Sequence, residues 1–190
     1  IYVPGNSARV FDEGMARKLP AGSRLSFQIH YTPSGKATEE RMRLGLIFAK
    51  EPPKEVLGGF SAGQGKFVIP PGAPAHEVTS KWTFQRDVKL VQLTPQMHLR
   101  GKDFRYVAKY PNGESEVLLN VPKYDFNWQH TYVLAQPKLL PKGTVIECIA
   151  HFDNSPNNKF NPDPKAEVRW GDQSWEEMMI GFGSFTTERQ

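Results

Sequence analysis

At 190 residues the chain is long enough to bury a hydrophobic core, as one large β-domain or as one small domain and part of another. Gly and Pro number 16 each and aromatic residues make up 12%, a composition that favours short strands and loops over helices. The formal net charge of +4 comes from interspersed Lys and Arg rather than from a basic stripe, so nucleic-acid binding is not expected.

Two strands are expected in the first quarter of the chain, after a turn-rich start over residues 1–23. Residues 24–33 alternate between apolar and polar side chains, with Phe27 on the apolar side and His30 on the polar side. A Pro-Ser-Gly turn ends this strand. A second candidate strand, residues 40–53, stops at a double proline, and we place a domain boundary there.

Short strands joined by Gly and Pro turns are expected over the rest of the chain. Residues 104–121 are typical of a hairpin around a Pro-Asn-Gly turn, and residues 144–152 are typical of an alternating strand. A polar loop follows at 153–164, and only residues 174–179 could start a helix. The pattern predicts an all-β fold, either an antiparallel sandwich or a jelly roll.

Several classes of protein find no support in the sequence. No apolar run approaches the ~18–20 residues of a membrane-spanning helix, and no signal peptide is visible. There is no nucleophile elbow and no phosphate-binding loop. The single cysteine, Cys148, lies in an apolar strand and is expected to be a small buried side chain. Glu176 and Glu177 are neighbours, which would face opposite ways on a strand and make a poor acid/base pair.

The strand that ends at His98 carries the most informative spacing. Counting by twos from Gln92, the side chains of Gln96 and His98 share one face. Residues at this spacing can hold one metal ion, and a His-x-His pair with a third ligand would suit copper. A thioether as the third ligand would favour Cu(I), because soft sulfur selects that state. Here the pair is Gln-x-His, so a surface or hydrogen-bonded histidine is the alternative.

Five motifs in sequence order carry a family resemblance. They are "PQMHLRGKDFRY", "YDFNWQHTY", "LPKGT", "HFDNSPNNKFNPDP" and "VRWGDQSWEEMMIGF". Together they resemble the copper type II, ascorbate-dependent monooxygenases, in particular the bacterial relatives of dopamine β-monooxygenase and peptidylglycine α-hydroxylating monooxygenase. The resemblance runs from about Phe27 to Phe185 and is most specific over residues 95–182.

The resemblance implies two consecutive jelly-roll sandwiches, each with one copper ion. Residues 1–53 would be the C-terminal part of the first sandwich, and residues 54–190 would be the complete second sandwich. In this family a His-x-His pair and a later Met, preceded by an acidic residue, hold the catalytic copper of the second sandwich. These positions fall on Gln96, His98 and Met178, so Gln96 replaces the first histidine.

The resemblance also implies a second, electron-transferring copper in the first sandwich. Its family ligands are an adjacent His-His pair and a histidine in a His-Tyr step. His30 matches the His-Tyr step, but no His-His step occurs in the sequence, so the site is incomplete. We expect the missing pair to lie in an upstream domain of the same precursor or to be lost.

Other interpretations stay open for the same residues. Met178 could fill a gap in the core while His98 only forms a hydrogen bond. Separately, Met179 could be the copper ligand in place of Met178. A further ligand could come from one of three histidines, His76, His130 or His151, of which His151 is expected to be exposed. The oxygen donors between Asp153 and Asp163 would suit calcium, although a loop held by Asx turns is favoured.

Two functions are therefore carried forward. The resemblance implies hydroxylation of a C–H bond with O2 and a reductant such as ascorbate, on a small-molecule or peptide substrate, in a periplasmic or extracellular protein. The chain alone would be inactive, because half of the electron path is missing. The alternative is a non-catalytic jelly-roll module for binding or assembly, which the replacement at Gln96 suggests.

Overall fold

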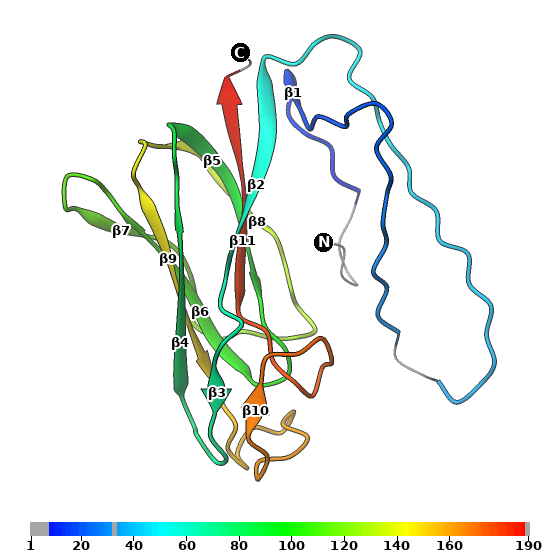
Figure 1. Ribbon diagram of the computed structural model, residues 1–190, viewed down its shortest axis with the longest axis vertical. Coiled ribbons are helices and arrows are strands. Elements are labelled where there is room, and N and C mark those ends of the chain that lie inside the picture. The colour runs from blue at the N-terminus through cyan, green and yellow to red at the C-terminus, as the bar shows by residue number, and fades with distance from the viewer. Residues whose placement is uncertain (1–7, 32–33, 189–190) are drawn as a thin grey trace.

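The computed structural model describes residues 8–31 and 34–188, and these form an all-β, sandwich-like fold in which no helix occurs (Figure 1). Expectations for residues 1–7, 32–33 and 189–190 fall outside the described residues. The first main sheet has the strand order β1-β2-β11-β5-β8, and the second has the order β4-β9-β6-β7. The first sheet contains β1 (Met15–Ala16), β2 (Glu55–Gly63), β5 (Val88–Gln96), β8 (Tyr132–Leu140) and β11 (Ile180–Glu188). The second contains β4 (His76–Thr83), β6 (Gly101–Lys109), β7 (Ser115–Val121) and β9 (Val145–Phe152), while β3 (Val68–Ile69) and β10 (Val168–Arg169) form a small ribbon.

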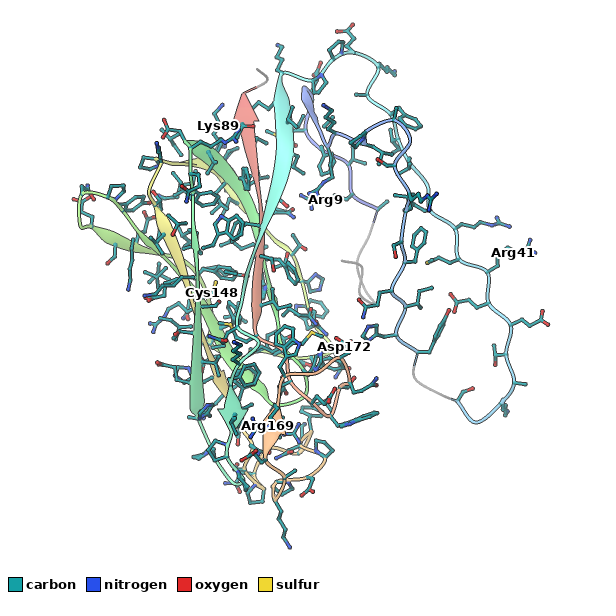
Figure 2. All side chains as sticks on the ribbon, in the orientation of Figure 1. Arg9, Arg41, Lys89, Cys148, Arg169 and Asp172 are labelled. Carbon is teal, nitrogen blue, oxygen red and sulfur yellow. The ribbon has the colours of Figure 1, made fainter. Side chains whose placement is uncertain are left out.

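Side chains from both sheets meet in one hydrophobic core. Leu90 and Leu93 of β5 are fully buried, as are Tyr106 of β6 and Cys148 of β9. Figure 2 shows Cys148 between the two sheets, which confirms the predicted buried cysteine. A Cβ added at Gly181 of β11 would lie 2.3 Å from Cys148 Sγ, so a glycine is needed where the sheets approach here.

The alternating pattern predicted several elements correctly. In β9 every second residue is buried, as expected for a strand with one face on the core. The predicted hairpin joins β6 to β7, with Lys109 opposite Ser115. Gly113 in its turn has a φ of 89°, a left-handed conformation that favours glycine. Residues 153–167 contain no strand, in agreement with the predicted loop.

The two strands expected at 24–33 and 40–53 are wrong. The described residues of both segments lie in an irregular N-terminal arm, residues 17–31 and 34–53, which runs apart from the sheets (Figure 1). Arg41 lies on its outer part (Figure 2). The arm exposes large apolar side chains, including Phe27 at 51%, Ile47 at 83% and Phe48 at 75%. Alternation alone makes no strand, because a strand also needs a neighbour for its backbone hydrogen bonds.

The strand expected to end at His98 ends two residues earlier, at Gln96. Its pairing with β11 is continuous from Gln92, opposite Ser184, to Gln96, opposite Ile180. The predicted alternation therefore holds over these five residues. Pro95 pairs with Gly181, which faces the other sheet, so the side chain of Gln96 lies on the outer face of the first sheet.

Candidate metal centre

His98 lies in the turn that connects β5 to β6, at one end of the two sheets. It lies outside β5, which ends at Gln96. It is also 6% exposed and therefore not a surface residue. The turn closes through a hydrogen bond from the backbone N–H of Gly101 to the carbonyl oxygen of His98, at 3.2 Å. Burial of an imidazole in such a turn requires partners for its polar atoms.

The carboxyl group of Glu177 joins this turn to the segment before β11. Its Oε2 accepts the backbone N–H of His98 at 2.8 Å, and its Oε1 accepts the backbone N–H of Arg100 at 2.6 Å. Glu177 is fully buried, and this burial raises the pKa of its carboxyl to about 8, although the two N–H groups and the Arg100 guanidinium oppose the shift. Glu177 therefore acts as a buried clamp between two segments.

Arg100 extends the same network towards the polar loop after β9. It is 1% exposed, and its Nε donates to Asn154 Oδ1 at 2.8 Å, while a terminal guanidinium nitrogen donates to the carbonyl oxygen of Trp175 at 2.7 Å. Burial lowers the pKa of Arg100, with Glu177 and Asp163 acting in the opposite direction. The guanidinium thus connects the β5–β6 turn to the loop after β9 and to the segment before β11.

The imidazole of His98 is held through its Nδ1 atom. Nδ1 lies 3.2 Å from the carbonyl oxygen of Glu176, and a carbonyl can only accept, so Nδ1 carries the hydrogen. Burial lowers the pKa of His98, opposed by the backbone carbonyls of Glu176 and Gln173, while the charge of His30 adds to the lowering. A neutral ring protonated at Nδ1 carries its lone pair on Nε2, which is one of the two forms in which an imidazole can bind a metal.

Met178 follows Glu177 and comes close to the same turn. The pairing of β11 with β5 ends at Ile180 and Gln96, so Met178 and His98 each lie two residues beyond the last paired residue of their strands. Met178 is half-buried, whereas Met179 is fully buried in the hydrophobic core. A role in the core was one interpretation of Met178. In the structure Met179 fills that role, and Met178 does not.

Gln96 and His98 are held on either side of a fixed residue, Met97. The hydroxyl of Tyr124 accepts the Met97 N–H at 3.0 Å and donates to the Met97 carbonyl oxygen at 2.8 Å. A Cβ on Gly101 would lie 2.7 Å from the Tyr124 ring, so glycine is needed for this approach. The structure brings Gln96, His98 and Met178 to one end of the β5–β11 pair.

Three of the other histidines occupy separate environments, whereas the charge of His30 acts on His98. His151 is half-buried rather than exposed, with Nδ1 2.7 Å from Asp103 and Nε2 3.4 Å from Glu77. The ring centroid of His130 lies 4.2 Å from that of Trp128. His30 is exposed on the arm, and His76 begins β4. Among the described residues no three His, Cys, Asp or Glu side chains form a group that could hold a metal ion, so none of these histidines joins His98 in such a group.

The oxygen-rich loop of residues 153–163 is held by its own side chains. Asp153 Oδ1 accepts the backbone N–H of Ser155 at 2.9 Å, and Asn158 Oδ1 accepts that of Phe160 at 3.0 Å. Asn161 Oδ1 accepts the N–H of Asp163 at 3.3 Å. These are the Asx turns that the sequence favoured for this loop.

Sequence reasoning missed the network that positions the site. In the sequence Glu177 is recognisable only as the neighbour of Glu176 and as the acidic residue before Met178, and nothing distinguishes Arg100 or Tyr124. Glu177 and His98 are 79 residues apart in the chain, and no local pattern announces their hydrogen bond. The only signal in the sequence was the acidic residue directly before Met178.

Comparison with models of known protein families gives no match for this chain, and comparison with curated proteins gives none either. The part of the chain that the structure describes contains no helix that is long and apolar enough to cross a membrane.

Proposed function

We propose that the chain is a copper-binding domain of a monooxygenase-like protein of the copper type II, ascorbate-dependent kind, with residues 54–190 as its jelly-roll second sandwich. The observation that carries the proposal is the state of His98. Its imidazole is buried, its pKa is lowered by that burial, and a backbone carbonyl holds it at Nδ1, while Met178 directly follows the Glu177 clamp. An ordinary surface histidine has none of these constraints.

The side chains present fit copper in part. A neutral imidazole and a thioether are suitable donors for Cu(I). Gln96 does not fit as a replacement for the first histidine, because its amide oxygen is a hard, weak donor for copper. In the enzymes that the chain resembles, copper at this position supplies O2 activation for hydroxylation of a C–H bond, with electrons from a reductant such as ascorbate.

The remaining residues of the site would orient the two ligands. Glu177 holds the backbone of His98 and directly precedes Met178, so one buried carboxyl fixes both ligand-bearing segments. Phe126 covers the imidazole from one side, with a centroid distance of 6.0 Å in an edge-to-face arrangement. Such partners keep a ligand histidine in one orientation and limit the access of water.

The N-terminal arm supports a further part of the proposal. Its apolar side chains alternate as they do in strands, yet they are exposed and unpaired in the described residues. This is what is expected if residues 1–53 belong to a first sandwich whose other strands lie in an upstream domain. His30 would then be one ligand of the electron-transfer copper, and the periplasmic or extracellular location follows from the family resemblance alone.

The proposal is tested by titrating the chain with Cu(I) in competition with a chromogenic chelator. We expect one equivalent to bind, with a loss of affinity of roughly 10- to 100-fold in His98→Ala and in Met178→Leu. His151→Ala is the matched control, because this histidine lies beside Asp103 on another sheet. Equal Cu(I) affinity in the wild type and in both ligand variants would overturn the proposal.

A specific observation favours the second candidate function, a binding or assembly module without catalysis. Gln96 stands at the position of the first family histidine, and its side chain lies on the outer face of the first sheet. If this replacement has ended copper binding, the wild type will bind no Cu(I) while Gln96→His binds it tightly.

A further inference from the structure

Three loops at the end of the fold that carries His98 enclose a groove of about 300 Å³. One wall is the turn between β5 and β6, with Leu99 and Gly101. The second wall is the loop after β7, and the third is the loop after β9. Loops at one end of a rigid sheet scaffold are common locations for binding sites.

Hydrogen bonds between the three loops fix the shape of this groove. The backbone N–H of Tyr124 donates to the carbonyl oxygen of Lys102 at 2.8 Å, and that of Asp153 donates to the carbonyl oxygen of Arg100 at 2.8 Å. The Asn158 amide donates to the carbonyl oxygen of Leu99 at 3.3 Å. A ligand would therefore meet walls that are already in place, which reduces the entropic cost of binding.

The lining combines aromatic rings with amines. Tyr124, Phe126 and Phe160 supply the rings. Phe160 is 49% exposed, and the amine of Lys159 lies 4.9 Å from its ring centroid. Rings of this kind offer faces and edges on which a planar ligand can stack.

The charges in the groove favour an anion. Three lysines, Lys102, Lys123 and Lys159, line it together with two carboxylates, Asp125 and Asp153. Each carboxylate already accepts a backbone N–H: Asp125 from Asn127 at 2.8 Å and Asp153 from Ser155 at 2.9 Å. The amine of Lys102 donates to the carbonyl oxygen of Pro74 at 2.9 Å, so Lys123 and Lys159, whose amine lies over the Phe160 ring, are the two amines that would meet the anion.

We propose that this groove binds a small planar carboxylate, with its aromatic ring against Phe160 and its carboxylate at Lys123 and Lys159. The volume is at the lower end of the range for ligand pockets and suits a single ring. Such a ligand matches the groove in two ways. Its ring can stack on an aromatic side chain, and its carboxylate can pair with a lysine amine.

Phe126 connects the groove to the candidate metal centre. Its ring lines the groove and also contacts the imidazole of His98 at a centroid distance of 6.0 Å. A ligand in the groove that displaces Phe126 therefore changes the environment of His98. The His98 ring resonances give an independent report of occupancy.

The test is an NMR titration of the chain without copper, using benzoate as the probe and benzamide as its uncharged counterpart. We expect saturable shifts at the amides of Leu99, Tyr124 and Phe160 with benzoate at concentrations up to about 20 mM. Lys123→Gln and Lys159→Gln should each weaken benzoate binding about two- to fivefold, the range for exposed ion pairs. Asp125→Asn keeps the oxygen that caps Asn127 and should strengthen binding.

Lys142→Gln is the control, because this exposed lysine lines a different surface cleft and should leave benzoate binding unchanged. Equal affinities for benzoate and benzamide, shifts outside the groove, or no saturable shifts would each overturn the proposal. Because the experiment uses the copper-free chain, its failure is separate from any failure of the Cu(I) titration.

Discussion

The buried carboxyl of Glu177 accepts the backbone N–H of His98 at 2.8 Å and so connects two segments that are far apart in the chain. The second oxygen of the same group accepts the N–H of Arg100. One side chain thus satisfies two donors of a turn that is hidden from water. The stability of the turn and the orientation of His98 depend on the same atoms.

Glu177→Gln should destabilise the fold while keeping the shape of the side chain. The amide replaces one accepting oxygen by an NH2 group that only donates, so one buried backbone N–H of the turn loses its partner. The expected loss in the free energy of unfolding is about 1–3 kcal/mol, measured by urea denaturation. Glu176→Gln is the control, since this side chain is half-buried and sits outside the clamp. Equal losses in both variants would contradict the role of the clamp.

The clamp also predicts a pH dependence of stability. Burial raises the pKa of Glu177 from 4.5 to about 8, so the folded state binds this proton more tightly than the unfolded state does. The contribution of Glu177 is therefore fully present below pH 4.5 and is lost as the pH rises through 8. The difference in the free energy of unfolding between wild type and Glu177→Gln should shrink between pH 5.5 and pH 8.5. If the difference in the free energy of unfolding stays constant from pH 5.5 to pH 8.5, the pKa of Glu177 is not raised in the folded state.

Tyr124→Phe should reduce stability although the aromatic ring is kept. The hydroxyl serves both the N–H and the carbonyl of Met97, and both backbone groups lie in a buried residue. We expect a loss of about 1–3 kcal/mol by thermal or urea denaturation. The matched control is Tyr110→Phe, whose hydroxyl donates to the exposed Glu116 and should matter little. If both variants lose the same free energy of unfolding, the hydrogen bonds to Met97 stabilise the fold no more than the exposed bond to Glu116 does.

Gly181→Ala should be costly because a methyl group there would meet the second sheet. The added Cβ would lie 2.3 Å from Cys148 Sγ and 2.9 Å from the Tyr106 ring. Overpacking of this kind costs about 1–3 kcal/mol. Removing the sulfur in Gly181→Ala/Cys148→Ala should recover part of the loss, beyond the sum of the single effects. Strictly additive effects would show that the two residues do not compete for the same space.

Apolar side chains of the N-terminal arm should contribute little to the stability of the fold, in contrast to apolar side chains of the core. Phe48→Ser and Ile47→Ser should change the free energy of unfolding by less than about 0.5 kcal/mol, because both residues are exposed. Leu90→Ala, at a fully buried position, should cost about 2–5 kcal/mol. Light scattering should also show less self-association in the arm variants, since an exposed apolar segment promotes it. A large loss of stability in Phe48→Ser would mean that the arm packs on the sheets in solution.

The parts of the fold that the sequence predicted are those where local chemistry and tertiary contacts agree. In β9 the alternation coincides with burial on one face, and at Gly113 the turn residue coincides with the required left-handed conformation. Residues 24–31 show equally clear alternation but lie in the arm, because strand formation also depends on a neighbouring strand.

The sequence predicted candidate ligands but not the network that supports them, and the ligand role of these residues stays a prediction. Spacing and resemblance led to Gln96, His98 and Met178, and the structure brings these residues to the same end of β5 and β11. The contacts of Glu177 and Arg100 depend on how distant loops meet, which no periodic pattern encodes. The same is true of the groove beside Phe126, whose lining comes from three separate loops.

The last described strand, β11, lies between β2 and β5 in the first sheet. During synthesis on the ribosome, β2 and β5 emerge long before β11. Until β11 is made, one edge of each strand lacks its native hydrogen-bonding neighbour. The sheet cannot close until β11 has been synthesised, which makes its folding slow and dependent on contacts between distant residues. A truncation that removes β11 would therefore split the sheet down its middle rather than trim its edge.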